Sequence, residues 1–426
     1  MSFASFISTI GNNSSVLPIV FKDGIESTFK TGLAYKQGSK VSKKEGFYEA
    51  REAAIEEFGT AGIWFATPIL VGKIFNEAMK KKYGLSSKEL LEAPRSLLKG
   101  KHYQKIEDNI KNLADSTIQA DFKTLDKEKL LKLGYIRSTL SVISAVGLIA
   151  GLTKFKQNLT KKSLEQSNNG NEKKTSKKGG KPAFKGGDSL VEPLLIDGGL
   201  SAIRIGTARS KSERIEYIFK QITFILVAYF GGGVIEKMLN KIAQICKLPL
   251  GLDAKVLADK DFIKKASDAC KNEVKKSEFL KFVDIEKNAS NLKKEEKVIK
   301  FIDKELKTGF NKGKFQNQTL EAARQSGIIS IKNNKRDACK FVDVDAVIKT
   351  NDHLKTFVNT ASQKSDSGKF IKNVKFAKYA SVLSNVALCS VILGVVLPKI
   401  QYLFREKMIG SVASPGIKAA NKDEAV

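Results

Sequence analysis

The sequence predicts an all-α, multi-pass membrane protein with about four apolar helices in two parallel pseudo-repeats, plus helical polar inserts. Three observations lead to this prediction. Apolar segments stand out from a lysine-rich background, sequence anchors recur in the same order in both halves, and the polar stretches carry apolar residues at helical spacing. With 426 residues, 42% of them hydrophobic, the chain is long enough to bury a sizeable core.

The four apolar segments lie near residues 58–75, 136–155, 217–236 and 376–400. Only the last contains an unbroken apolar run of the roughly 20 residues that a helix needs to cross the hydrocarbon core of a bilayer. The other three can be extended, because a long cationic side chain near a helix end reaches the headgroups. Lysines, arginines and aromatic residues flank the segments, as at membrane interfaces. We therefore expect all four to cross the membrane; the alternative is that they are central helices of a soluble core.

Small and polar residues inside these segments are expected at helix contacts. Small side chains let two helices approach closely, and a side-chain amide can form a hydrogen bond across a helix pair. The residues expected to mediate this packing are Gly147, Gly151, Gly231, Gly232, Gly233 and Asn385.

The two halves of the chain share a proline motif. The stretch SSVLPIVFKDGI at residues 14–25 matches SLVEPLLIDGGL at residues 189–200. Further along, Glu56 corresponds to Glu216, each just ahead of an apolar segment, and later matches keep the same order. A shared order of matches indicates a duplication, although two pairs of membrane helices also resemble each other through composition alone. The repeat anchors are Pro18, Gly24, Pro193 and Gly199.

The expected organisation is two units joined by a linker. Unit one covers residues 1–160 and unit two covers residues 189–408, with a helical polar insert at 238–375. Residues 161–188 read as a flexible, basic linker, and residues 409–426 as a disordered tail. Two crossings per unit return the chain to its starting side, so the units are parallel. A lysine-rich, asparagine-rich and histidine-poor composition is typical of AT-rich bacterial genomes, so we expect a bacterial inner-membrane protein. Because a polybasic linker is attracted to anionic lipid, we expect the linker and both termini on the cytoplasmic side.

Ionisable residues near the apolar segments are the candidate functional residues, because charge within a membrane is costly and tends to serve function. One hypothesis places them along a polar path at the interface between the units. The alternative is that the acidic ones lie in water or among headgroups, paired loosely with neighbouring cations. The residues of the hypothetical path are Glu56, Glu216, Arg137, Lys73 and Lys220.

No catalytic, cofactor or metal site is predicted. The sequence contains no Walker A loop, no HExxH and no GxSxG motif. Its four cysteines are far apart and it has only two histidines, which argues against a zinc site and against imidazole catalysis. We therefore expect a protein that is not an enzyme.

The charge balance points to anionic partners. The 74 Lys and Arg residues exceed the 45 Asp and Glu residues, giving a net charge of +29. The expected partners are the lipid bilayer and its anionic headgroups, with a second copy or another membrane protein as further candidates. The expected function is membrane organisation, assembly or small-solute translocation. A peripheral or soluble helical protein that binds anionic lipid is the alternative, and nucleic-acid binding is a weaker one, because no recognition module is present.

Overall fold

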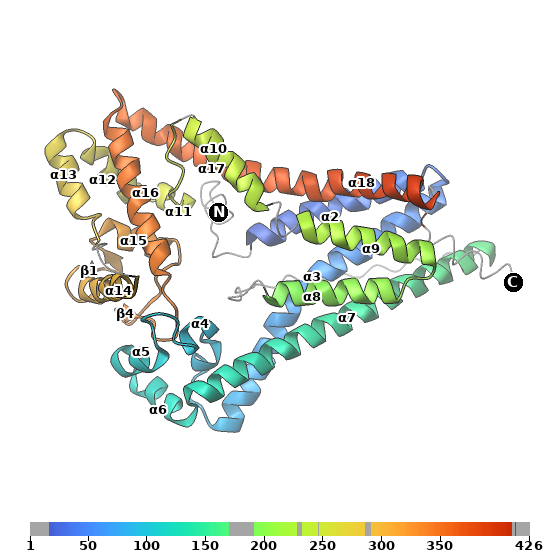
Figure 1. The fold of residues 1–426 in the computed structure, drawn as a ribbon, viewed down its shortest axis with the longest axis horizontal. Helices are drawn as coiled ribbons and strands as arrows, with labels where there is room; N and C mark the ends of the chain where they lie inside the picture. Colours follow the sequence, from blue (N-terminus) through green and yellow to red (C-terminus); the bar gives the residue numbers. More distant parts are fainter. Residues whose placement is uncertain are drawn as a thin grey trace.

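The computed structural model describes residues 17–169, 191–227, 232–245, 247–285, 291–410 and 414. The described chain is mostly helical, with only four strands of two residues each. Its helices form two regions, a bundle of long helices and a domain of short helices at one end of that bundle (Figure 1). The prediction of a mostly helical chain is therefore confirmed.

The bundle is built from long helices that run between its two ends (Figure 1). Three helical stretches are long and apolar enough to cross a membrane: Lys43–Tyr83, Lys127–Ser163 and Ser367–Met408. This finding fits a membrane protein. The elements of the bundle are α2 (Leu17–Gly38), α3 (Lys43–Tyr83), α7 (Lys127–Asn169), α8 (Val191–Gly206), α9 (Lys211–Leu226), α10 (Gly232–Ile245), α17 (Ser367–Val391), the π-helical turn η3 (Ile392–Val396), α18 (Leu397–Phe404) and the π-helical turn η4 (Arg405–Ile409).

Three of the four expected apolar helices are found among the described residues, and the fourth is not confirmed. The segment near 217–236 is not one membrane-length helix among these residues. Its described parts belong to α9, of 16 residues, and α10, of 14 residues. Residues 228–231, with Gly231 among them, lie outside the description.

The two proline motifs overlap helices α2 and α8. Pro18 and Pro193 lie within two residues of the first residue that the structure describes in each helix. Each of these helices turns back into the next one, α3 or α9. Both following helices start with a serine cap: Ser42 Oγ accepts from the Glu45 amide at 3.0 Å, and Ser210 Oγ accepts from the Glu213 amide at 3.1 Å.

Two antiparallel helix pairs form the centre of the bundle. In the first, α3 packs on α7, with the side chain of Leu152 against Gly59. In the second, α9 packs on α18, where the rings of Phe219 and Phe404 stack with centroids 3.9 Å apart. The side-chain amide of Gln401 also donates to Thr223 Oγ1 at 3.1 Å. In each pair, a polar insert separates the two helices in the sequence.

The first helix of each half packs on the last helix of the other half. Helix α8 runs beside α7, and a Cβ on Gly199 would lie 2.6 Å from Val146 Cγ2. Helix α2 runs beside η3 and α18, and a Cβ on Gly394 would lie 3.1 Å from Glu26 Cα. These glycines allow close approach of the two backbones, because any side chain there would meet its neighbour. By contrast, nothing lies within 4 Å of a Cβ on Gly24.

Replacing Gly394 with alanine is expected to lower the free energy of unfolding by about 1–3 kcal/mol, because the added methyl overpacks the contact with α2. The matched control is Gly147→Ala on α7, since nothing lies within 4 Å of a Cβ there. The control variant is expected to be neutral or slightly more stable, as alanine favours helix. Denaturant unfolding in detergent micelles measures both, and equal effects would contradict the close contact.

The glycines Gly147 and Gly151 lie on an exposed face of α7, with no neighbour within 4 Å of the position of a Cβ. They therefore make no close helix contact with the described part of the chain. Asn385 accepts a hydrogen bond from the Cys389 thiol at 3.3 Å, one turn along the same helix α17. This bond lies within one helix rather than across a pair.

The polar inserts fold into short helices and two hairpins. The first insert contains η1 (Leu90–Glu92), α4 (Arg95–Leu98), α5 (Ile106–Leu113) and α6 (Ser116–Thr124). The second contains α11 (Ala254–Ala258), α12 (Lys260–Ala269), α13 (Glu273–Lys281), α14 (Asn291–Thr308), β1 (Phe310–Asn311), β2 (Lys314–Phe315), α15 (Gln318–Gln325), β3 (Ile331–Lys332), β4 (Lys335–Arg336) and α16 (Val344–Ser362). Strand β1 pairs with β2, and β3 with β4, both antiparallel.

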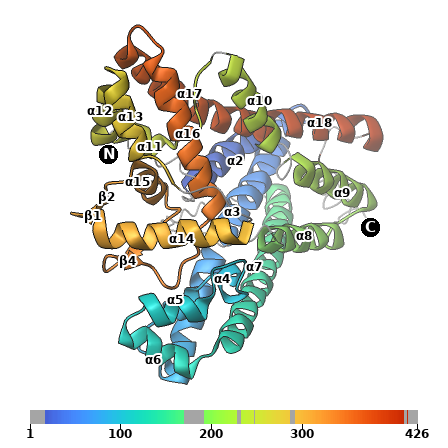
Figure 2. The same ribbon diagram turned by 60° about the vertical axis from the view of Figure 1, so that its left-hand side comes forward.

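The two inserts form a single helical domain, which we call the insert domain (Figure 2). The core of the first insert includes Ala338 and Cys339 from the second. Buried Gln104 also joins them: its side chain accepts from the Val342 amide at 2.9 Å and donates to Glu295 Oε1 at 3.0 Å. The inserts that the sequence separates by unit are therefore one structural region.

The expected linker and tail fall largely outside the described residues. Helix α7 continues to Asn169, so the first part of the stretch 161–188 is helical. The rest of that stretch lies outside the description, as does the tail 409–426 except for residues 409, 410 and 414.

Candidate functional site

A cluster of buried charged side chains lies at the end of the bundle farthest from the insert domain. It sits near the turns that join α2 to α3 and α8 to α9 (Figure 1). We call it the ionic layer. Its members are Glu45, Glu49, Glu52, Glu56, Lys156, Arg204, Arg209, Glu213, Glu216, Lys220 and Arg405.

The acidic side of the layer comes from one face of α3. Glu45, Glu49, Glu52 and Glu56 are spaced by four, three and four residues, which places them on the same side of a helix. The first three are buried. A helix face with four carboxylates is unstable by itself, because like charges repel, so it requires cations from neighbouring helices.

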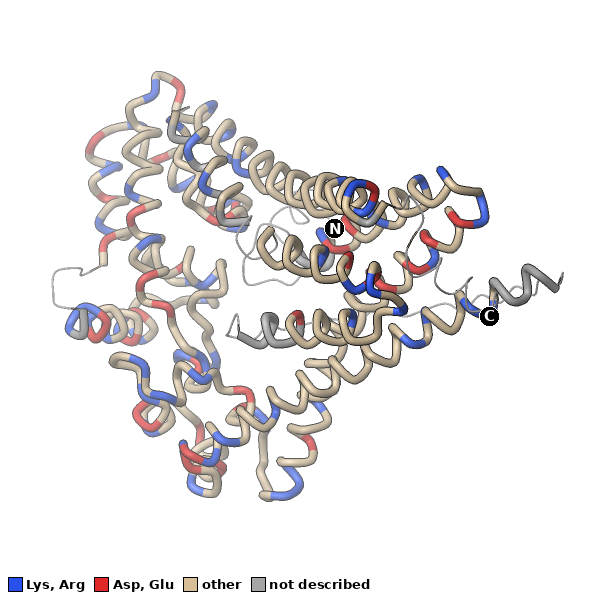
Figure 3. Tube along the Cα trace, turned by 45° about the vertical axis from the view of Figure 1, so that its right-hand side comes forward, with Lys and Arg blue, Asp and Glu red and all other residues tan. Residues whose placement is uncertain are grey.

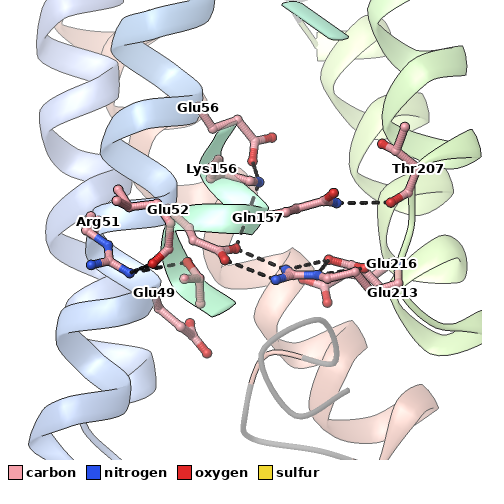
Figure 4. Close-up of polar contacts among 12 residues, drawn as sticks. Glu49, Arg51, Glu52, Glu56, Lys156, Gln157, Thr207, Glu213 and Glu216 are labelled. Carbon is pink, nitrogen blue, oxygen red and sulfur yellow. Dashed lines mark hydrogen bonds and ion pairs between the residues drawn. The ribbon is translucent and has the colours of Figure 1, made fainter. Parts of the chain in front are cut away.

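Helices α7 and α8 supply cations to Glu56. Lys156 Nζ lies 2.6 Å from Glu56 Oε2 and 3.9 Å from Glu52 Oε2, and Arg204 Nε lies 3.0 Å from Glu56 Oε1. Figure 4 shows Lys156 directed at Glu56, with Gln157 donating to the Thr207 carbonyl oxygen at 3.0 Å beside it. One carboxylate therefore ties α3 to both α7 and α8.

Arg209, in the turn between α8 and α9, binds Glu52 with both terminal nitrogens of its guanidinium. Its Nη1 and Nη2 each lie 3.1 Å from one Glu52 carboxylate oxygen. The same Nη2 lies 2.8 Å from Glu213 Oε1. Such fork-to-fork pairing fixes both distance and orientation. It holds the second helical hairpin against α3.

Arg405 connects three helical elements. From η4, its Nη1 lies 3.1 Å from Glu49 Oε1 on α3, and its Nη2 lies 2.7 Å from Glu216 Oε1 on α9. Lys220 Nζ also lies 2.6 Å from Glu216 Oε1. Burial alone would raise the pKa of Glu216, but Lys220 and Arg405 lower it to about 2. The carboxylate is therefore ionised at neutral pH and acts as a fixed anion.

Glu45 differs from the other members of the layer. It is buried, and its Oε1 has no hydrogen-bond partner among the described residues. The layer holds six glutamates against five cationic side chains, so the charges do not balance one to one. Beside the layer, Lys30 on α2 lies 2.7 Å from Glu26 and 2.9 Å from Glu57, which ties α2 to α3.

The structure brings together three of the five residues of the hypothetical polar path. Glu56, Glu216 and Lys220 are all in the ionic layer. Arg137 is not: its Nη1 lies 2.7 Å from the Leu91 carbonyl oxygen, next to the insert domain. Lys73, in the second half of α3, is exposed. The five residues therefore do not line one continuous path in this structure.

Sequence reasoning missed most of the cations and acids of the layer. The spacing of Glu49 and Glu52 ahead of Glu56 is visible in the sequence and could have shown an acidic helix face. Arg405 follows the last apolar segment as a single arginine after QYLF, which is a weaker signal. Its partners lie 189 and 356 positions away, so only the fold shows the pairing.

The contacts of the ionic layer point to a role in holding helices together more clearly than to a role in a chemical reaction. Among the described residues there is no group of three or more His, Cys, Asp or Glu side chains suited to hold a metal ion. The cationic groups each have a carboxylate partner within 4 Å, which leaves them as structural charges. Comparison with protein-family models, curated proteins and solved structures finds no match.

Proposed function

We propose that this chain is an integral membrane protein whose two parallel helical units hold a lysine-rich helical domain against a bilayer. In this proposal it serves in membrane organisation or in the assembly of other membrane components, and it is not an enzyme. The observation that carries the proposal is a belt of exposed apolar side chains around the bundle.

The belt lies between two charged regions. Leu70 and Ile74 on α3, Ile143 and Leu148 on α7, and Val391 on α17 are all exposed. Figure 3 shows charged residues gathered in the insert domain and at the opposite end of the bundle, with long uncharged stretches of helix between them. Exposed apolar surface of this extent is unfavourable in water. A bilayer would cover it, with the charges at both water-facing ends.

The helix contacts support a duplication. The antiparallel pair α3 and α7 resembles the pair α9 and α18, and α2 and α8 each pack on the final helix of the other half. In each half a cation near the end of the second long helix binds a glutamate of the first: Lys156 binds Glu56, and Arg405 binds Glu216. Two such units related by an axis along the membrane normal would be parallel repeats.

The ion pairs favour anchoring and assembly over solute translocation. Glu49, Glu56 and Glu216 are held by cations within 3.1 Å, and the pairs of Arg204 with Glu56 and of Arg405 with Glu49 join the two units rather than opening a path between them. The joined insert domain gives the bundle a rigid, basic platform outside the belt. A platform with this charge suits contact with anionic membrane components.

Membrane fractionation tests the proposal. The expressed protein is washed with high salt, with alkaline carbonate and with detergent. We expect only detergent to release it, because inserted helices do not respond to screening of charge. Release by salt or carbonate would overturn membrane insertion. It would instead favour a peripheral helical protein whose basic surface binds anionic lipid.

A further inference from the structure

Helix α10 carries a stripe of exposed apolar side chains. Val234 is 65% exposed, Met238 48%, Ile242 50% and Ile245 81%. Their spacing of four, four and three residues places them on one face of the helix. The described part of α10 has 14 residues, fewer than the roughly 20 of a bilayer crossing.

Two lysines border this stripe. Lys237 and Lys241 are exposed and lie one turn apart, so they fall on the same side of α10. At 100° per residue, both lie along one edge of the apolar stripe. Along the other edge of the stripe lies buried Ile235, and α10 packs on α17. An apolar face edged by lysines is typical of a helix that lies in a membrane interface.

The position of α10 in the fold matches that role. Just after α10, the Leu250 carbonyl oxygen accepts a hydrogen bond from Lys378 Nζ at 2.9 Å, and Ala254 packs on Tyr379. These contacts lie where α17 leaves the insert domain and enters its apolar stretch (Figure 2). Phe376, nearby on α17, is 75% exposed. Because α10 packs on α17, its stripe lies beside a helix of the apolar belt.

We propose that α10 is an interfacial helix that binds anionic phospholipid. Its apolar stripe enters the acyl chains, and Lys237 and Lys241 contact the lipid phosphate. The inference rests on the proposed membrane insertion of the bundle. The occupant is lipid rather than a protein, because the stripe lies beside an apolar belt that lipid covers and because its lysines complement anionic headgroups.

Tryptophan fluorescence in vesicles tests the inference. Trp64 is the only tryptophan in the sequence, so Trp64→Phe with Met238→Trp places a single reporter on the stripe. The protein is reconstituted in phosphatidylcholine vesicles that contain a fixed fraction of brominated phosphatidylcholine or brominated phosphatidylglycerol. We expect both lipids to quench the reporter, and the anionic lipid to quench it about threefold or more strongly because it collects at the lysines.

The lysines are tested by Lys237→Gln with Lys241→Gln in the reporter background. This variant is expected to lose the preference for the anionic lipid while quenching by both lipids persists. The matched control is Lys304→Gln with Lys307→Gln on α14, two exposed lysines of the insert domain, which should keep the preference.

The outcomes separate this inference from the proposed function. A reporter that brominated lipid does not quench, in a protein that only detergent extracts, would overturn the interfacial role of α10 alone. In that case a protein partner or a second copy of the chain would cover the apolar stripe of α10. Quenching without an anionic preference would overturn phosphate binding. Extraction by carbonate would overturn both proposals together.

Discussion

Replacing Arg405 with methionine is expected to lower the free energy of unfolding by about 3–5 kcal/mol. Arg405 is only 3% exposed, and its guanidinium binds Glu49 on one helix and Glu216 on another. Without it Glu49 is left as a buried carboxylate with no cation within 4 Å among the described residues, and Glu216 keeps only Lys220. Removing one partner of a buried ion pair carries this cost, because the other partner remains buried as an unpaired charge.

Unfolding in detergent micelles, followed by circular dichroism, measures this effect. The matched control is Lys399→Met on α18, an exposed cation two turns earlier, which is expected to change the free energy by less than about 0.5 kcal/mol. Adding Glu49→Gln and Glu216→Gln to Arg405→Met should recover part of the loss, since it removes the unpaired charges. An Arg405 variant as stable as its control would show that the ionic layer does not hold the bundle together.

Replacing Phe357 with alanine is expected to destabilise the insert domain by about 3–5 kcal/mol. Phe357 on α16 is fully buried in a core shared by α11, α12 and α17, where it contacts Phe262. The lost stability has two parts: the free energy gained when the ring is transferred out of water, and the cost of the cavity that the ring leaves behind. The substitution lies outside the ionic layer, so its effect should begin in the insert domain.

Hydrogen exchange resolves where that effect appears. Protection in α11–α16 is expected to fall, while protection in α3 and α7 changes much less. Phe282→Ala in the same domain is the matched control, because Phe282 is 52% exposed and its truncation leaves no buried cavity. If the two phenylalanine variants behaved alike, the assignment of a separate core to the insert domain would be wrong.

Hydrophobic patterning predicted the positions of the long helices better than it predicted their ends and their packing partners. The segments near 58–75 and 376–400 lie within long helices because their apolar runs and flanking lysines are local features. The segment near 217–236 is described only in part, as α9 up to Leu226 and α10 from Gly232, so the fourth expected crossing is not confirmed.

The candidate site shows the same limit more strongly. Glu56 and Glu216 were identified because each lies at the edge of an apolar segment, and both belong to the ionic layer. Arg137 and Lys73 have the same local signal but lie at the other end of the apolar stretches. The difference depends on helix direction and on partners far along the chain. A single sequence does not contain that information in its local pattern.

The joining of the two inserts also sets an order of events during synthesis. Leu97 and its neighbours in the first insert lie against Ala338 and Cys339, which leave the ribosome more than 200 residues later. At 5–20 residues per second, the first insert waits roughly 10–40 s for those residues. During that interval it exposes one side of its core. The first half of the protein therefore depends on chaperones or on the nearby bilayer until the second half arrives.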